Sequence, residues 1–231
     1  MGVRSRWVKV VAGQLGRPSG PLGRVVGVIL NRRNRTTLTA AVQALDLSPG
    51  ATVADVGFGG GLGLGLLLRE VGSTGVVHGI ELSKTMLSQA TRRHCTQITA
   101  GRLRLHEASM THLPLEDSAL DGILTVNTIY FVSDLDAAFA EFARSLKGTG
   151  RVIIGFGDPA ALADIPFTAH GFRLRPVPEV VDALSSAGLS LESDVRVGDG
   201  DSAMHLLVAR LSRSSGQRAA ALGTTQADGS T

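Results

Sequence analysis

The feature that most constrains the fold is a regular alternation, from about residue 50 onward, of short apolar runs and longer helical patterns. The apolar runs are rich in β-branched residues and predict five strands, at 52–57, 76–81, 102–107, 119–127 and 151–156. Helical patterns at 62–72, 83–94 and 134–148 separate most of these strands. Strands that alternate with helices favour a parallel sheet with helices on both faces. The predicted fold class is therefore α/β, doubly wound.

The C-terminal part of the chain departs from this alternation. After an irregular stretch at 157–175 and a helix predicted at 178–188, two strand patterns follow at 189–198 and 203–211. The turn-rich sequence GDGDS joins them. So short a connection is typical of antiparallel neighbours, so the two strands predict a hairpin at the end of the sheet.

The clearest helix pattern is DLDAAFAEFARSLKG, at 134–148. Ser133 or Asp134 is a suitable N-cap, and Gly148 stands where a glycine commonly follows the last helical turn. The apolar positions recur with helical spacing, at Leu135, Phe139, Phe142 and Leu146.

Composition divides the chain into four segments. Residues 1–21 are rich in glycine, proline and arginine and predict a flexible basic arm, and residues 22–48 predict an N-terminal helical extension. Residues 49–211 hold the α/β pattern and form the main domain. Residues 212–231 have no apolar stripe and predict a disordered tail. With 231 residues, of which 43% are hydrophobic, the chain can bury one substantial core.

The charged residues are distributed unevenly. The formal net charge is +3, but the first 45 residues contain eight basic residues and no acidic ones, which leaves a net charge of −5 on the remainder. A basic arm of this kind can contact an anionic membrane surface or an anionic substrate, or it can be a solvated extension without a ligand. Aromatic residues are not interleaved with its basic ones, so we expect no nucleic-acid partner.

Cysteine usage and hydropathy bear on the cell compartment. The single cysteine, Cys95, excludes a disulfide framework and cysteine zinc sites, and it fits a reducing compartment. No apolar run approaches the roughly 18 residues of a membrane span, and the N-terminal sequence lacks the apolar core of a signal peptide. We therefore expect a cytoplasmic protein. Its oligomeric state does not follow from the sequence.

The glycine-rich sequence ADVGFGGGLGLG, at 54–65, follows the first predicted strand and marks the expected ligand site. A phosphate-binding P-loop needs a glycine followed by lysine, a pair absent from this chain. A dinucleotide fingerprint needs glycine or alanine at the sixth position of GxGxxG, and every frame here has leucine there. The remaining pattern is DxGxGxG, formed by Asp55, Gly57, Gly59 and Gly61.

This last pattern resembles motif I of the class I S-adenosylmethionine-dependent methyltransferases. GIELSKTML, at 79–87, resembles the family's second motif, and Glu81 falls 20 residues after Gly61. EASMTHLPLEDSALD and LKGTGRVII resemble the stretches that precede the family's strands four and five. The resemblance covers about residues 50 to 210. It implies a seven-stranded, mostly parallel sheet with an antiparallel last strand, and S-adenosylmethionine as cofactor.

The resemblance also implies roles for residues of the first two motifs. Asp55 would hold the methionine ammonium of the cofactor, and Glu81, followed by Leu82, would accept hydrogen bonds from the ribose hydroxyls. The backbone would approach the cofactor closely at Gly57, Gly59 and Gly61. Phe58 would pack under the methionine moiety or belong to the core.

Three further positions complete the predicted cofactor site. Ser109 stands where the family usually has an acid for the adenine amino group, so its hydroxyl would accept that hydrogen bond without charge. The backbone amide of Met110 would serve the adenine ring. Asn127, at the end of the fourth predicted strand, would bind the cofactor or the substrate.

Candidates for a general base are Tyr130, His112 and His170. They follow the fourth strand, the third strand and the fifth strand, respectively. A base is required only when the accepting atom carries a proton that must leave. We single out His170 and Tyr130, and His170 lies in the longest irregular stretch.

The sequence also limits the methyl acceptor. The end of the fourth strand reads NTIY, without the prolines of enzymes that methylate DNA amino groups, and no Pro-Cys pair suits cytosine C5 chemistry. No group of three carboxylates at the rim indicates a magnesium site. A small-molecule acceptor, lipid-like or anionic, remains. The alternative is a non-catalytic or regulatory protein that binds the cofactor with the same fold.

Overall fold

The computed structural model describes residues 34–163, 165, 168, 171–198 and 203–212. The predicted basic arm at 1–21, the first part of the helical extension, His170 and nearly all of the predicted tail lie outside these residues. Within the described part of the chain, no helix has the length and apolar character needed to cross a membrane.

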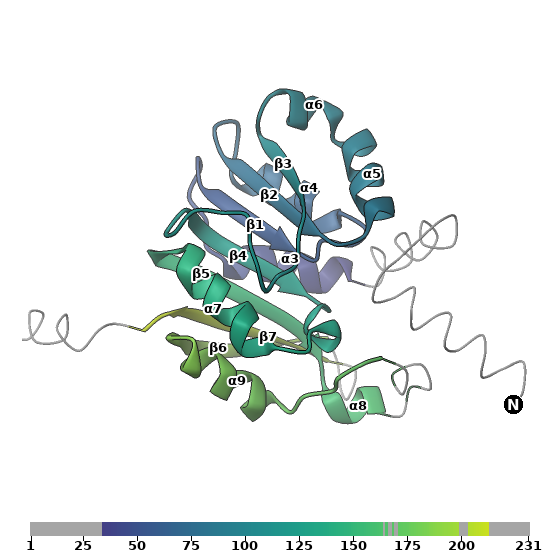
Figure 1. The fold of residues 1–231 in the computed structure, drawn as a ribbon, viewed down its shortest axis with the longest axis vertical. Helices are drawn as coiled ribbons and strands as arrows, with labels where there is room; N and C mark the ends of the chain where they lie inside the picture. The colour runs from purple at the N-terminus through teal and green to yellow at the C-terminus, as the bar shows by residue number, and fades with distance from the viewer. Residues whose placement is uncertain (1–33, 164, 166–167, 169–170, 199–202, 213–231) are drawn as a thin grey trace, which may run out of the picture.

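The described residues form one mixed sheet with helices on both sides (Figure 1). The strands are β1 (Thr52–Val56), β2 (Val76–Glu81), β3 (Leu103–Glu107), β4 (Leu120–Val126), β5 (Leu146–Gly157), β6 (Leu189–Val197) and β7 (Met204–Leu211). The helices are α3 (Arg35–Ala44), α4 (Leu62–Glu70), α5 (Lys84–Arg93), α6 (Cys95–Thr99), the 3₁₀ turn η1 (Ile129–Phe131), α7 (Leu135–Ser145), α8 (Pro159–Ala163) and α9 (Val177–Ser186).

The order of the strands confirms the predicted fold class. Seven strands lie in the order β3-β2-β1-β4-β5-β7-β6. Strands β1 to β5 pair in parallel, whereas β7 runs antiparallel to both of its neighbours, β5 and β6. The predicted C-terminal hairpin is therefore confirmed, and it inserts its second strand beside β5. The order in which strands are added to the sheet reverses between β1 and β4, and ligands bind at this switch point in sheets of this type.

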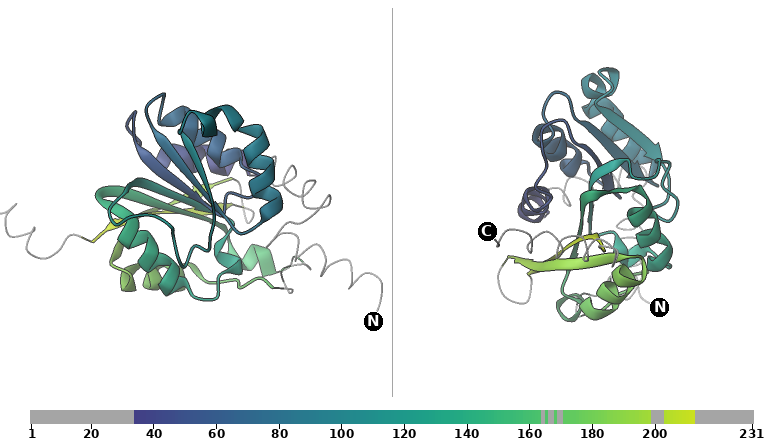
Figure 2. Two further views of the ribbon diagram at one scale, coloured as in Figure 1. Left: turned by 45° about the horizontal axis from the view of Figure 1, so that its top comes forward. Right: turned by 90° about the vertical axis from the view of Figure 1, so that its left-hand side faces the viewer.

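Two apolar cores lie on opposite faces of the sheet (Figure 2). Helices α7 and α9 cover one face, with Phe139, Phe142 and Leu184 fully buried. Helices α3, α4 and α5 cover the other, where Ala41, Leu67 and Met86 are fully buried. Helix α3 therefore packs on the sheet as part of the core, since its residues from Leu38 to Leu45 join the same cluster as the strands.

Side chains cap two helix starts, and the second of these caps was predicted from the sequence. Ser83 precedes α5 and its hydroxyl accepts a hydrogen bond from the amide of Met86, at 3.3 Å. Asp134 precedes α7 and its carboxylate accepts from the amide of Ala137, at 2.9 Å.

The predicted end of α7 is wrong. The helix stops at Ser145, and β5 begins at Leu146, so Gly148 lies inside a strand rather than after a helix. Leu146 has extended backbone angles and is paired with Leu120 of β4. Leu146 is buried as a strand residue. Its spacing also fits the apolar stripe of the preceding helix, and the prediction was wrong for this reason.

The stretch predicted as irregular also contains a short helix. Helix α8 spans Pro159–Ala163, and Asp158 precedes it with a carboxylate oxygen that accepts from the amide of Ala160, at 2.9 Å. The Asp-Pro pair thus starts a helical turn directly at the carboxyl end of β5.

Candidate active site

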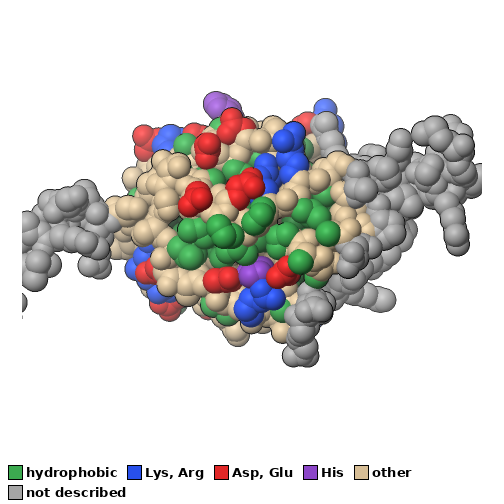
Figure 3. Space-filling model, turned by 90° about the horizontal axis from the view of Figure 1, so that it is seen from below, with side chains coloured by type: hydrophobic (Ala, Val, Ile, Leu, Met, Phe, Trp, Pro, Cys, Tyr) green, Lys and Arg blue, Asp and Glu red, His purple; other side chains and the backbone are tan. Residues whose placement is uncertain are grey.

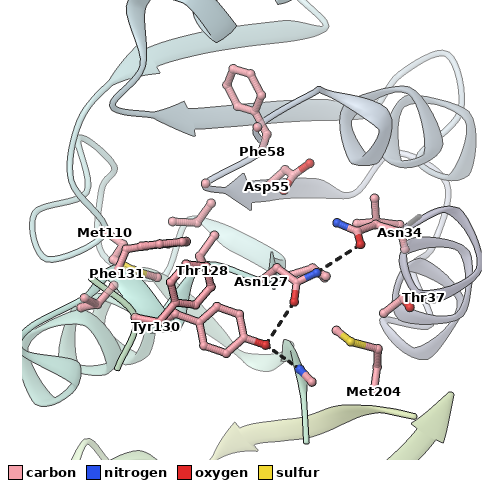
Figure 4. Close-up of a pocket in the computed structure, with 18 of the residues that line it drawn as sticks. Asn34, Thr37, Asp55, Phe58, Met110, Asn127, Thr128, Tyr130, Phe131 and Met204 are labelled. Carbon is pink, nitrogen blue, oxygen red and sulfur yellow. Dashed lines mark hydrogen bonds between the residues drawn. The ribbon is translucent and has the colours of Figure 1, made fainter. Parts of the chain in front are cut away.

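A pocket of about 840 Å³ opens at the carboxyl ends of the parallel strands (Figure 4). Its walls come from the loops after β1, β2, β3, β4 and β5, from the start of α3 and from the β6–β7 end of the sheet. Pockets that hold a drug-sized ligand span roughly 300–1,000 Å³, so this one has room for a nucleoside-sized cofactor and a small second molecule. Every predicted cofactor residue except Gly61 lines it.

The glycine loop turns sharply away from β1. Gly57 has a φ of +73°, and a side chain there would overlap the methyl group of Thr128 in the loop after β4. Only glycine satisfies both conditions, because other residues rarely adopt this φ and all of them carry a Cβ. Gly61 lies one step behind the pocket, as the N-cap residue of α4, so the structure gives it a place in the turn rather than in the lining.

Asp55 is the buried acid of the site. It is 3% exposed, and its Oδ2 atom has no hydrogen-bond partner among the described residues. Burial and, to a smaller extent, the nearby charge of Glu81 raise the pKa of Asp55 to about 8. A buried unpaired carboxyl oxygen is costly, and a cationic ligand at this point would pair with it and favour its ionised form.

Gly63 also belongs to this site, although it lies outside the DxGxGxG pattern. It lies in the first turn of α4, directly against the carboxyl group of Asp55. A Cβ atom at residue 63 would overlap Oδ2 of Asp55. The absence of a side chain is therefore what leaves space for the Asp55 carboxyl group.

Glu81 ties the second strand to the glycine loop. One of its carboxylate oxygens accepts from the amide of Gly59, and the other accepts from the amides of Leu82 and Ser83, all at 2.9 Å. The side chain is 8% exposed and faces the pocket. Three backbone donors hold this carboxylate in one orientation, with lone pairs left for further donors.

The remaining predicted cofactor residues lie around these two acids. Leu82 is at the rim and is 44% exposed. The Ser109 hydroxyl lies 2.8 Å from the Thr111 hydroxyl and accepts from the Thr111 amide at 3.2 Å. Met110 and Phe58 are buried at the pocket wall, and Phe58 belongs to the core on the α4 side of the sheet.

Asn127 has an unusual backbone conformation at the end of β4. Its φ is +60°, a region that residues other than glycine rarely occupy and that is often found at functional sites. The side-chain Nδ2 of Asn127 donates to Oδ1 of Asn34, just before α3. Its side-chain Oδ1 accepts from the Tyr130 hydroxyl, and both distances are 3.2 Å (Figure 4). Asn34 was not singled out in the sequence, because nothing in its neighbourhood indicates that α3 reaches the site.

Tyr130 is held on two sides. Its hydroxyl oxygen accepts from the amide of Gly157 at 2.6 Å and its proton points to Asn127. Burial raises the pKa of Tyr130. The hydroxyl is therefore neutral near pH 7, with its proton already engaged, which suits a residue that positions Asn127 better than one that removes a proton. His112 is exposed and outside the pocket lining, and His170 lies outside the described residues.

The half of the pocket away from Asp55 is mainly apolar. Its walls include Leu38 of α3, Phe131 of η1, Leu162 of α8, Phe172 and Met204. Its only described carboxyl group belongs to Asp158, and no lysine, arginine or histidine occurs among the described lining residues. The described residues also contain no group of three or more histidine, cysteine, aspartate or glutamate side chains that could hold a metal ion.

Comparison with known proteins identifies this arrangement. A protein-family model described as "Methyltransferase domain" matches residues 54–154, which run from β1 to β5 and contain Asp55 and Glu81. Residues 54–154 thus match a methyltransferase domain, and in this part the chain is similar to the class I S-adenosylmethionine-dependent methyltransferases.

The curated relatives match the chain over about half its length. An uncharacterized 37.1 kDa protein in transposon TN4556 of Streptomyces fradiae is 36% identical over 124 residues, and methyltransferase GfsG of Streptomyces halstedii is 33% identical over 112 residues. These matches cover 54% and 48% of this chain but only 35% and 40% of the two relatives. The chain thus spans less than half the length of these two relatives.

A solved structure supports the fold of the chain as a whole. Geranyl diphosphate C-methyltransferase from Streptomyces coelicolor A3(2), in complex with Mg²⁺, geranyl diphosphate and S-adenosyl-L-homocysteine, has a TM-score of 0.67. The match covers 91% of this chain and 99% of that one at 18% identity, so the likeness concerns the fold alone.

The residues present fit the cofactor of this family, S-adenosylmethionine. Its methionine end carries an ammonium group, and the pocket holds an unpartnered carboxyl oxygen, that of Asp55. Its ribose carries two hydroxyl donors, and Glu81 offers a fixed carboxylate with remaining lone pairs. Both acids lie in the same half of the pocket, next to the glycine loop.

Proposed function

We propose that the chain transfers a methyl group from S-adenosylmethionine to a small, largely apolar molecule. The observation that carries this proposal is the division of one pocket into two unlike halves. One half has the buried acids Asp55 and Glu81 beside a glycine loop, and the other is mainly apolar. The first half suits the cofactor and the second suits an acceptor.

The cofactor half has a role for each of the predicted residues. Asp55 binds the methionine ammonium and Glu81 the ribose hydroxyls, while the loop at Gly57 and Gly59 admits the cofactor close to the backbone. Ser109 and the Met110 amide bind the adenine group, Leu82 covers it at the rim, and Phe58 packs behind the loop. Gly61 starts α4 and so fixes the turn.

The reaction depends mostly on alignment. The cofactor supplies a methyl group on a positively charged sulfur, already activated for in-line transfer to a nucleophile. The chain aligns the acceptor and excludes water from the transfer. Asn127, held by Tyr130 and Asn34, directs polar atoms toward the middle of the pocket, where the two halves meet.

General-base catalysis is a smaller part of the proposal. Tyr130 positions Asn127 rather than removing a proton, because its hydroxyl is neutral and its proton is engaged. The role of His170 is tested by His170→Ala. If His170 is the base, turnover falls at least tenfold with cofactor affinity unchanged, and unchanged turnover removes it from the reaction.

Two measurements on the full chain test the proposed function. Thermal unfolding with S-adenosylmethionine, S-adenosylhomocysteine, NAD and NADP should show stabilisation by the first two alone. Transfer of labelled methyl groups to a metabolite extract should then yield a labelled small molecule. Stabilisation by NAD or NADP alone contradicts the proposal.

The alternative is a non-catalytic protein that binds the same cofactor. The observation that favours it is the absence of lysine, histidine and cysteine among the described lining residues. Stabilisation by the cofactor together with no labelled product from any extract fraction would support this alternative.

A contact between the basic arm and an anionic membrane surface stays a prediction. The arm, at 1–21, lies outside the described residues. Removal of residues 1–21 should abolish binding to vesicles that contain anionic lipid, and equal binding by the full and truncated chains contradicts the contact.

A further inference from the structure

The acceptor half of the pocket contains one described acid, Asp158. Asp158 lies at the carboxyl end of β5, immediately before α8, and lines the pocket beside Leu162. The other two acids of the described lining, Asp55 and Glu81, belong to the cofactor half. Asp158 is therefore the one carboxyl group that the described residues present to an acceptor.

Neighbouring groups hold Asp158 in place and in its ionised form. Its Oδ1 accepts from the amide of Ala160 at 2.9 Å, and its Oδ2 lies 3.4 Å from the Arg196 guanidinium and 3.5 Å from Nε2 of His205. The Ala160 amide, and after it His205 and Arg196, lower the pKa of Asp158. The side chain is 29% exposed, so it is held but still reachable from the pocket.

Other charged and titratable groups near Asp158 lie outside the pocket lining. Nδ1 of His205 lies 2.7 Å from Oδ2 of Asp194, and the ring of His205 stacks on Phe156 of β5, with ring centres 5.5 Å apart. Asp194 and His205 are not part of the pocket lining. Figure 3 shows the face seen from below, where a band of hydrophobic side chains has acidic, basic and histidine side chains at its edge.

The remaining described walls of this half offer no positive charge to a negative ligand. They are apolar at Leu38, Phe131, Phe172 and Met204, and none of the described lining residues is basic. Apolar walls strengthen the interaction of any ligand charge with Asp158, because they exclude water. A carboxylate or phosphate on the acceptor would be repelled, whereas a hydroxyl or ammonium group would donate a charge-assisted hydrogen bond.

We propose that Asp158 selects the methyl acceptor, which is an apolar molecule that carries a hydrogen-bond donor, an amine or a hydroxyl, and no anionic group near it. This inference rests on the proposed function, since it assigns the second half of the same pocket. It decides between the lipid-like and the anionic acceptors expected from the sequence, in favour of the former.

Binding of three matched probes to the full chain, loaded with S-adenosylhomocysteine, tests the selection. The probes are 4-phenylbutylamine, 4-phenylbutan-1-ol and 4-phenylbutanoate, which share an apolar tail and differ in the polar end group. Isothermal titration calorimetry should give measurable binding of the amine and the alcohol. The carboxylate should bind at least tenfold more weakly than the amine.

Two variants separate direct selection by Asp158 from a general effect of charge. Asp158→Asn removes the charge but keeps an oxygen for the Ala160 amide, because asparagine is as good an N-cap as aspartate. It should reduce the amine-to-carboxylate preference at least fivefold. Asp194→Asn removes a charge from the same cluster outside the pocket, and should leave the preference within twofold.

The outcomes distinguish this inference from the function on which it rests. Failure of the unsubstituted chain to bind S-adenosylhomocysteine overturns the proposed function and the inference together. If S-adenosylhomocysteine binds, three results overturn the inference alone: the carboxylate binds as well as the amine, the amine and alcohol fail to bind, or Asp158→Asn and Asp194→Asn change the preference equally. The first two need no variant, so they hold even if Asp158→Asn does not fold.

Discussion

The two halves of the pocket are built in different ways. The cofactor half comes from two short stretches, 55–60 and 81–82, together with the loop at 108–111, and backbone amides hold the carboxylate of Glu81 in place. The acceptor half draws on residues as far apart as Asn34 and Met204, and most of its wall is apolar side chain. One half is thus a local structure at the ends of adjacent strands, while the other exists only when distant elements assemble.

This difference predicts which substitutions should affect each half. A substitution near the glycine loop acts on charge and hydrogen bonding toward a ligand with fixed chemistry. A substitution in the acceptor half acts on packing and on the choice of acceptor. The following predictions separate the effects on the two halves, and they are given in order of decreasing size.

Asp55→Asn should have the largest effect. It removes the carboxylate proposed to bind the cofactor ammonium, and loss of a charged hydrogen bond costs about 1.5–3 kcal/mol. We expect the affinity for S-adenosylhomocysteine, measured by calorimetry, to fall by about 10- to 100-fold. A fall of less than threefold would contradict the role of Asp55.

The same variant should make the cofactor-free protein more stable at pH 8. The pKa of Asp55 is raised from 3.8 to about 8 in the folded chain, so its contribution to stability is full below pH 3.8 and is lost as the pH rises through about 8. Asp55→Asn removes this loss. Thermal unfolding at pH 8 should therefore shift upward, by roughly 2–5 °C, while the shift near pH 4 should be smaller.

Cofactor affinity should also depend on pH in a defined direction. Binding of a cation favours ionised Asp55, and below pH 8 this ionisation has to be achieved against the raised pKa. The affinity for S-adenosylhomocysteine should rise between pH 6 and pH 8, by at most about tenfold per pH unit. Calorimetry on Asp55→Asn provides the control, since the affinity of this variant should not rise with pH. A rise of equal slope in both proteins would assign the pH dependence to another group.

Gly63→Ala should weaken cofactor binding without harming the helix. A methyl group at this position overlaps Oδ2 of Asp55, whereas at Gly65 the nearest atom, Cε1 of His94, is at an ordinary contact distance of 3.8 Å. We expect about a tenfold loss of affinity for S-adenosylhomocysteine with Gly63→Ala and less than twofold with Gly65→Ala, which gains helix propensity of about 1 kcal/mol. Equal affinities in the two variants would show that Asp55 does not need this space.

Tyr130→Phe should act on the acceptor half alone. It leaves the Gly157 amide without its acceptor and frees Asn127, and an unsatisfied buried donor costs about 1–3 kcal/mol. Denaturant unfolding should show that loss, and calorimetry should show an affinity for S-adenosylhomocysteine within twofold of the original. A large loss of cofactor affinity would place Tyr130 in the cofactor half instead.

The fold was predictable because its signals are local and repeated. Five strand patterns, the helices between them and the C-terminal hairpin all follow from residue types and spacing, and the structure confirms the resulting sheet. The end of α7 was not predictable, because the burial of Leu146 fits a helical stripe as well as a strand. Only pairing with Leu120 of β4 decides it.

The part of the site that could be predicted is the part whose residues lie close together in the sequence. The predicted residues around Asp55 and Glu81 lie in the pocket, apart from Gly61, because consecutive residues at strand ends remain neighbours after folding. Asn34 and Asp158 were missed, since neither belongs to a motif. Asn34 reaches the pocket only because α3 packs on the sheet, and Asp158 only because β5 ends there.

The sequence by itself determined the α/β fold, the cofactor to expect and the position of the glycine loop, because each depends on residues that are close in the chain. The tertiary structure decided what the acceptor meets: apolar walls, one acid at Asp158 and the chain of hydrogen bonds from Gly157 through Tyr130 and Asn127 to Asn34. These residues are spread over the chain, and the spacing along a sequence carries no record of which strand ends and helices come together around a ligand.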